Sequence, residues 1–245
     1  MADLAPYRKL INVTETDCDS AGRMGAAAMV YYLQEAASAH AELLDVGIPR
    51  LSKLGALWVV TRMGLELTRL PEKGENIYVE TWPGKTRHVL FPRYYAIRSE
   101  DGETLARGAG VWMLIHPESR KMLFPEEIGL QVPDLSSGGE PPLPDRRVRF
   151  PETLPRSGAH TAGENELDVN GHVNNVHYLR WAESLLPEGF APAHRLKNLW
   201  VEYRKEIMLG QNVELHHTIE DGALYVQGTV DGDEHYRLRF GYEGA

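Results

Sequence analysis

The segment LDVNGHVNNVHYLRW, residues 167–181, crowds hydrogen-bonding side chains into a few positions directly before an apolar, helix-like pattern. Asp168, Asn170 and His172 stand at every second position, and in an extended segment that spacing points all three side chains the same way. The free N–H groups and the positive dipole end of the following helix suit an oxyanion. A carboxylate, an amide and an imidazole that converge beside such donors indicate acyl-transfer chemistry.

Part of this segment also has a purely structural interpretation. Asn174 or Asn175 would cap the start of the helix, and Asp168 would close a turn. A capped turn does not need both Asn170 and His172, and we therefore expect those two side chains to serve chemistry.

A weak internal repeat indicates what positions these residues. The segment DSAGRM, residues 19–24, aligns with DVNGHV, residues 168–173, at an offset of 149. Two further pairs follow in the same order: 58–62 with 200–204 at an offset of 142, and 74–77 with 210–213 at an offset of 136. The shared order and the slowly falling offsets predict a duplicated unit with small deletions in the second copy.

Both copies follow one plan, in which a polar loop leads into an amphipathic helix and then into strands. We expect helices over 26–44 and 175–186, which are followed by Gly47 and Pro187, respectively. Segments rich in β-branched and aromatic residues predict strands over 57–67, 76–82, 93–99 and 104–115. This is an α+β pattern, in which an antiparallel sheet wraps around a central helix. Pairing the two halves edge to edge would close the exposed edge of each sheet.

The domain boundaries follow from a linker-like segment between the copies. Residues 132–144, VPDLSSGGEPPLP, hold four prolines, two glycines and two serines. We therefore predict an N-terminal domain over 1–131, a linker over 132–144 and a C-terminal domain over 145–245.

Composition narrows the class of protein. The 245 residues are 42% hydrophobic and 25% charged, which is typical of a soluble globular chain, and no apolar run reaches the ~18 residues of a membrane span. A net charge of −9 argues against a general nucleic-acid binder. The single cysteine, Cys18, excludes an internal disulfide and a cysteine-based metal cluster. With no signal or transit peptide visible, we expect a cytoplasmic protein without a cofactor or metal.

Several motifs together resemble those of acyl-acyl-carrier-protein (acyl-ACP) thioesterases. They are DVNGHVNNVHYLRW, YYLQEAASAHAELLDVG, VETWPGKTRHVLFPRYYAI, ARGAGVWMLIHPESRKMLFPEE and VEYRKEIMLGQNVEL, and the resemblance covers roughly residues 7–240. It implies two fused hotdog folds, each a long helix wrapped by an antiparallel sheet. The activity implied is hydrolysis of the thioester that holds a fatty acyl chain on the phosphopantetheine of acyl carrier protein.

The resemblance assigns roles to four residues of this chain. Asp168, Asn170 and His172 match the family's catalytic segment, and Glu206 matches its acidic catalytic residue. Plant members carry a cysteine directly after that acid, whereas this chain has Ile207, which favours attack by water over a thiol mechanism. The expected scheme has Glu206 activate the water while His172 and a backbone N–H stabilise the oxyanion. First attack by Asp168, which would form an anhydride, stays open.

The first copy is expected to hold no equivalent site. It has Ala21 where Asn170 falls and Arg23 where His172 falls, and the family places the acyl-chain pocket largely in this half. Basic residues of the second half could receive an acidic carrier protein, namely Arg146, Arg147, Arg149, Arg195, Lys197, Arg204 and Lys205.

Three other functions compete with this one. The segment TDCDSAGRM, residues 16–24, resembles the Asp-bearing loop of small single-hotdog thioesterases, and in an acyl- or aroyl-CoA thioesterase Asp19 would be the working carboxylate. A hotdog protein that binds acyl chains without catalysis is the second, and a dehydratase is a weak third. Acyl chain length and assembly into a homodimer stay open.

Overall fold

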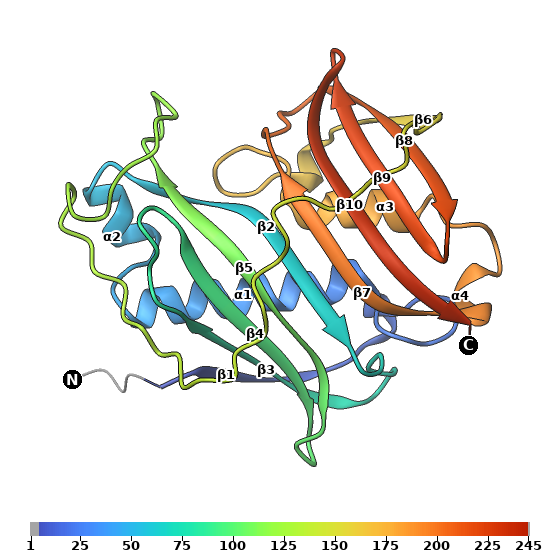
Figure 1. Cartoon of the computed structure of the whole chain (residues 1–245), viewed down its shortest axis with the longest axis horizontal. Helices are drawn as coiled ribbons and strands as arrows, with labels where there is room; N and C mark the ends of the chain where they lie inside the picture. The colour runs from blue at the N-terminus through green and yellow to red at the C-terminus, as the bar shows by residue number, and fades with distance from the viewer. Residues whose placement is uncertain (1–4, 245) are drawn as a thin grey trace.

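The computed structural model describes residues 5–244, and its first half has the elements of one sheet wrapped around one long helix (Figure 1). In chain order these are β1 (Tyr7–Asn12), the 3-10 turn η1 (Glu15–Asp17), α1 (Ala26–Leu43), α2 (Ile48–Lys53), β2 (Leu57–Leu67), β3 (Asn76–Pro83), β4 (Phe91–Ser99) and β5 (Thr104–Ile115). The predicted strands 57–67 and 104–115 agree with β2 and β5 residue for residue. The helix predicted over 26–44 is observed as α1, which ends one residue earlier than predicted.

The second half repeats this order with shorter helices. Its elements are β6 (Arg156–Thr161), η2 (Glu164–Glu166), α3 (Val176–Glu183), α4 (Phe190–Ala193), β7 (His194–Tyr203), β8 (Asn212–Glu220), β9 (Ala223–Val230) and β10 (Asp233–Gly244). The helix predicted over 175–186 is thus shorter at both ends. Its last turn tightens, because the N–H groups of Leu185 and Leu186 bond to carbonyls three residues back, and Pro187 cannot continue it.

Within residues 5–244 the strands form one ten-stranded antiparallel sheet in the order β1-β3-β4-β5-β2-β7-β10-β9-β8-β6. The second five strands mirror the first five, and the two sets meet where Arg62–Glu66 of β2 pairs with Asn198–Glu202 of β7. This join, in the middle of Figure 1, confirms the predicted edge-to-edge pairing of two copies and the α+β double-hotdog architecture.

The larger of two hydrophobic core clusters contains residues of both halves. One cluster of buried residues includes Met29 and Leu33 on α1, Leu65 on β2, and Leu179 on α3, all of them 2% exposed or less. The two helices pack against each other inside the curved sheet, as Figure 1 shows behind the strands. No helix within residues 5–244 is long and apolar enough to span a membrane.

The segment between the halves crosses the outer face of the sheet. Pro144 lies against Gly64 of β2, the indole N–H of Trp200 donates to the carbonyl of Asp145 at 3.0 Å, and Phe150 stacks edge-on against Trp200. Residues 116–155 contain no helix or strand of the sheet. The domain limits at 131 and 145 stay predictions, since core and sheet are continuous across them.

Candidate active site

The loop Asp168–His172 is a tight turn rather than the extended segment that its alternating polar residues predict. The N–H of Asp168 donates to the carbonyl of His172 at 2.7 Å, and the N–H of Gly171 donates to the carbonyl of Asp168 at 3.0 Å. Gly171 has φ 78°, a conformation that costs other residues energy. The Asp168 Oδ1 atom accepts the backbone N–H groups of Asn170 (2.8 Å) and His172 (3.2 Å). Asp168 therefore does close a turn, and the side chains converge because of the turn.

The first copy builds the same turn from different side chains. Asp19 Oδ1 accepts the N–H groups of Ala21 (2.8 Å) and Arg23 (3.1 Å), and Gly22 has φ 76°. Arg23 stands at the position that corresponds to His172 in the second copy. Its guanidinium donates to the carbonyls of Ala191 and of His194. The match of these backbone bonds with those at Asp168–His172 supports the duplication. The Arg23 hydrogen bonds make the first loop a structural contact between the halves.

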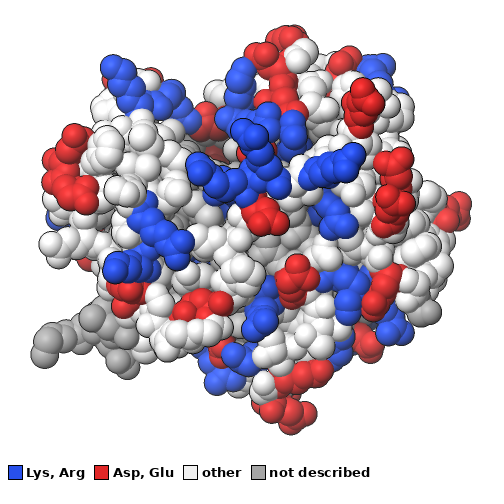
Figure 2. All heavy atoms as spheres, in the orientation of Figure 1, with Lys and Arg blue, Asp and Glu red and all other residues white. Residues whose placement is uncertain are grey.

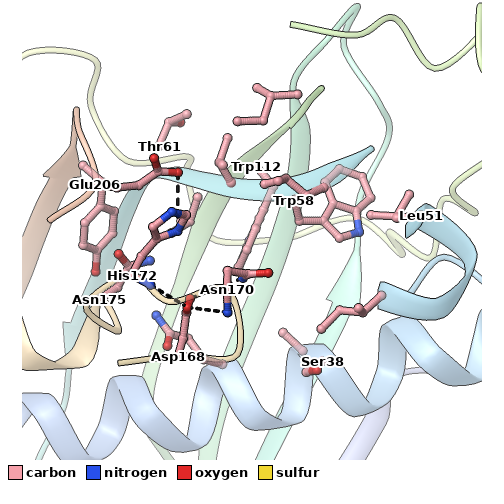
Figure 3. Close-up of a pocket in the computed structure, with 18 of the residues that line it drawn as sticks. Ser38, Leu51, Trp58, Thr61, Trp112, Asp168, Asn170, His172, Asn175 and Glu206 are labelled. Atoms are coloured by element: carbon pink, nitrogen blue, oxygen red, sulfur yellow. Dashed lines mark hydrogen bonds and ion pairs between the residues drawn. The ribbon is translucent and has the colours of Figure 1, made fainter. Parts of the chain in front are cut away.

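A short antiparallel bridge brings Glu206 beside His172. His172 pairs with Met208, and the N–H of Val173 donates to the carbonyl of Ile207 at 2.8 Å. This places Glu206 Oε1 at 3.8 Å from His172 Nδ1, with the Glu206 side chain 34% exposed and the His172 side chain 20% exposed. The predicted residues Asp168, Asn170, His172 and Glu206 thus lie together, as Figure 3 shows.

Two residues that the sequence did not indicate support Glu206. Arg120, from the loop after β5 in the first half, forms an ion pair with Glu206 Oε1. His235, which is buried, donates from Nδ1 to the carbonyl of Glu206 at 2.9 Å. Burial lowers the pKa of His235, so its ring is neutral at neutral pH and holds the Glu206 backbone as a plain hydrogen-bond donor. Neither contact has a sequence signature, because both partners are distant along the chain.

The asparagines before α3 have the structural role that was expected for one of them. Asn174 Oδ1 accepts the N–H of Val176 at 3.1 Å, which satisfies one of the free donors at the helix start. The Asn175 side chain makes no capping hydrogen bond and lines the cavity.

A cavity of about 990 Å³ extends from these polar residues into the first half, between α1 and the sheet. Its polar end is lined by Asp168, Asn170, His172 and Glu206, and its apolar walls include Ala37, Ala41, Leu51, Trp58, Phe91 and Trp112. In Figure 3 the polar side chains face the same space that Trp58, Trp112 and Leu51 border on the other side. The site therefore joins a cluster of polar side chains to apolar walls, an arrangement suited to a ligand with a polar head and an apolar tail.

The single thiol lies outside this cavity. Cys18 is half-buried, and its Sγ donates to the carbonyl of Thr14 at 3.3 Å. Burial and the neighbouring carboxylates of Asp17 and Asp19 raise the pKa of Cys18, which keeps it a neutral thiol at neutral pH and a poor nucleophile.

Comparison with known families identifies this architecture. The model of the acyl-ACP thioesterase N-terminal domain matches residues 5–128, and the model of the C-terminal domain matches residues 163–240. The chain belongs to the acyl-ACP thioesterase family. The resemblance inferred from the motifs is confirmed, and the two family domains match the two copies of the repeat.

Relatives of the family come from plants and bacteria. The chain is 30% identical over 229 residues to the palmitoyl-acyl carrier protein thioesterase of Arabidopsis thaliana, which covers 86% of this chain and 55% of the relative. It is 27% identical over 212 residues to the dodecanoyl-[acyl-carrier-protein] hydrolase of Cinnamomum camphora, over 80% of this chain and 55% of the relative. The chain thus spans about half the length of these curated relatives.

Solved structures share the fold over nearly the whole chain. A putative oleoyl thioesterase from Lactobacillus plantarum aligns with a TM-score of 0.83 and 22% identity, over 99% of this chain and 98% of the other. The 12:0-ACP thioesterase from Umbellularia californica aligns with a TM-score of 0.84 and 23% identity, over 98% of both. At these identities the likeness establishes the double-hotdog fold.

Proposed function

We propose that this protein hydrolyses the thioester of fatty acyl-ACP and releases a free fatty acid. The observation that carries the proposal is the convergence of Asp168, Asn170, His172 and Glu206 at the polar end of one cavity with apolar walls. Membership of the acyl-ACP thioesterase family supports the substrate class. The relatives' names state that they act on acyl chains carried by acyl carrier protein.

In the proposed reaction Glu206 takes a proton from a water molecule, which attacks the thioester carbonyl carbon. His172 lies within reach of the same water or of the oxyanion, because its Nδ1 is 3.8 Å from Glu206 Oε1. The tetrahedral intermediate then expels the phosphopantetheine sulfur. The proton taken by Glu206 passes to that sulfur, so water and thioester give one carboxylic acid and one thiol.

The contacts of Asp168 favour water over the anhydride route. Its Oδ1 accepts two backbone N–H groups, and its Oδ2 lies 3.4 Å from the amide nitrogen of Asn170. Lone pairs engaged in hydrogen bonds are poor nucleophiles, and attack would dismantle the turn. We assign Asp168 the task of orienting Asn170 and the loop.

The proposed partner is acyl carrier protein, and basic side chains near the cavity mouth suit an acidic carrier. Arg120, Arg204 and Lys205 line the cavity, and Figure 2 shows Lys and Arg gathered around a hollow in the upper part of the molecule. The basic residues suggested by the sequence are spread widely. Arg195 lies near the start of β7 and Arg204 directly follows its end, roughly 30 Å apart at the rise of a strand.

The surroundings of Asp19 favour the competing assignment less than those of Asp168 favour the proposed one. Asp19 is absent from the cavity lining, accepts backbone N–H groups within its own loop, and lies 3.7 Å from the Arg23 guanidinium. An acyl- or aroyl-CoA thioesterase that uses this carboxylate would need it free and beside a cavity.

The function is tested by offering the same acyl chains on acyl carrier protein and on coenzyme A. We expect free fatty acid from the carrier-bound thioester, with kcat/KM at least about tenfold above that for coenzyme A, a difference of about 1.4 kcal/mol. The His172→Ala variant, prepared identically, controls for contaminating hydrolases. Binding of acyl carrier without any release of fatty acid would instead favour the non-catalytic binding protein.

A further inference from the structure

Gln34 on α1 places an unused hydrogen-bond donor at the site. Its amide nitrogen Nε2 is buried and has no acceptor among residues 5–244, and the residue lines the same cavity as Asn170 and His172. A buried amide without a partner destabilises the folded state, so such groups call for an explanation. Ser38, one turn further along α1, faces the same cavity in Figure 3, which puts Gln34 on the helix face that borders the site.

The duplication supplies a comparison for this position. At the offset of 149 that relates Asp19 to Asp168, Gln34 corresponds to Glu183 on α3. The Glu183 carboxylate reaches across to the start of α1, where its Oε1 accepts the N–H of Ala27 at 3.2 Å. A side-chain oxygen of the protein thus already accepts a hydrogen bond at the helix start of the first copy.

The second copy leaves the corresponding place open. The N–H of Val176, which corresponds to Ala27, bonds to Asn174 instead of Gln34. The near-isosteric change from a carboxylate to an amide replaces a group that only accepts hydrogen bonds by one that also donates them. The catalytic copy thus has an amide donor at the position where the other copy uses a carboxyl oxygen to cap a helix.

We propose that Gln34 is a catalytic residue whose Nε2 donates a hydrogen bond to the thioester carbonyl oxygen and stabilises the oxyanion beside the start of α3. This inference rests on the proposed hydrolysis. Nε2 can only donate, and an oxyanion is the acceptor that gains most from a buried donor. A hydrogen bond donated to the attacking water would make its oxygen a weaker nucleophile, so the carbonyl oxygen is the better match.

The test compares kcat, KM and pH profiles of Gln34→Met and Gln34→Glu with those of the wild type on acyl-ACP. Met keeps the length and loses the donor, and we expect kcat to fall by about 10²–10³ with KM changed less than threefold. Gln34→Glu should be equally slow at pH 8.5. The ratio of its kcat to that of the wild type should rise as the pH falls toward 5.5, because a protonated carboxyl regains a donor.

The matched control is Glu183→Gln, which puts an amide at the equivalent position of the first copy. Its kcat should stay within about threefold of the wild-type value. A folded Gln34→Met variant with wild-type kcat, or a Gln34→Glu ratio that does not change with pH, would overturn the role of Gln34. Absence of wild-type turnover on acyl-ACP in the same series would instead refute the proposed function.

Discussion

At the scale of single residues, the turn closed by Asp168 brings the side chains of Asn170 and His172 to the cavity. The sequence indicated residues that the structure brings together at one cavity, because a carboxylate, an amide and an imidazole so close together exceed what a helix cap needs. The extended conformation that the alternating polar residues predicted for this loop is wrong. Such alternation suits a strand, but it also suits a turn whose aspartate accepts the N–H groups two and four residues further on. Arg120 could not be found, because it meets Glu206 only through folding of the two halves together.

We predict that Asn170→Ala and His172→Ala each lower kcat by about a hundredfold or more and leave the fold intact. Both side chains line the cavity, and neither belongs to the buried core. Steady-state kinetics on acyl-ACP, with circular dichroism to confirm folding, measures the loss. Asp19→Asn is the matched control, since Asp19 makes the same turn away from the cavity, and it should keep near-wild-type kcat. Wild-type turnover in either site variant would refute the assignment.

At the scale of elements, α1 begins without a side-chain cap of its own and uses one from α3. Its N-cap is Gly25, and the missing acceptor comes from Glu183 of the other half. Burial raises the pKa of Glu183 from its ordinary 4.5 to about 7. The strands were predictable because alternation and β-branched residues are local signals. This cap was not, since it joins two helices that are far apart in sequence.

The raised pKa of Glu183 makes stability depend on pH in a defined direction. A folded-state pKa above the unfolded one means that the folded protein holds the proton more tightly. The stabilisation is full below about pH 4.5 and is lost as the pH rises through about 7. Glu183→Gln cannot ionise, so relative to the wild type it should gain on the order of 1–3 kcal/mol between pH 5 and pH 8.5.

Chemical denaturation of both proteins at several pH values measures this difference. Glu188→Gln, an exposed position in the same region, serves as the control and should follow the wild type throughout. A Glu183→Gln variant whose stability falls with pH as steeply as that of the wild type would show that Glu183 does not titrate in this range.

At the scale of the whole molecule, the two copies of the repeat share one continuous sheet. β2 and β7 would each be an open edge in a separate half, and here they pair over Arg62–Glu66 and Asn198–Glu202. The core cluster and the cavity also take residues from both halves. The duplication and its edge-to-edge join could be predicted from three short matches that keep their order. The resemblance also implied a division of labour between the copies. In the structure the four candidate site residues come from the second copy, and most apolar cavity walls come from the first.

We therefore expect residues 1–131 and residues 145–245, expressed separately, to aggregate or to pair with themselves. Each would expose the sheet edge and the helix face that the other half covers. Size-exclusion chromatography and thermal unfolding report the outcome, and co-expression of the two pieces is the control that should restore a soluble complex. A soluble monomeric half that unfolds cooperatively would contradict the fused-pair account.

The central claim is that Glu206 drives hydrolysis through water at the one site that the two halves build. The most direct measurement is single-turnover release of fatty acid from acyl-ACP by Glu206→Gln and Cys18→Ser at several pH values. An amide keeps the shape of Glu206 and cannot take a proton, so the account predicts a loss of about a hundredfold or more in Glu206→Gln. Near-full activity is expected in Cys18→Ser, because the thiol lies outside the cavity. An inactive Cys18→Ser beside an active Glu206→Gln would contradict the account.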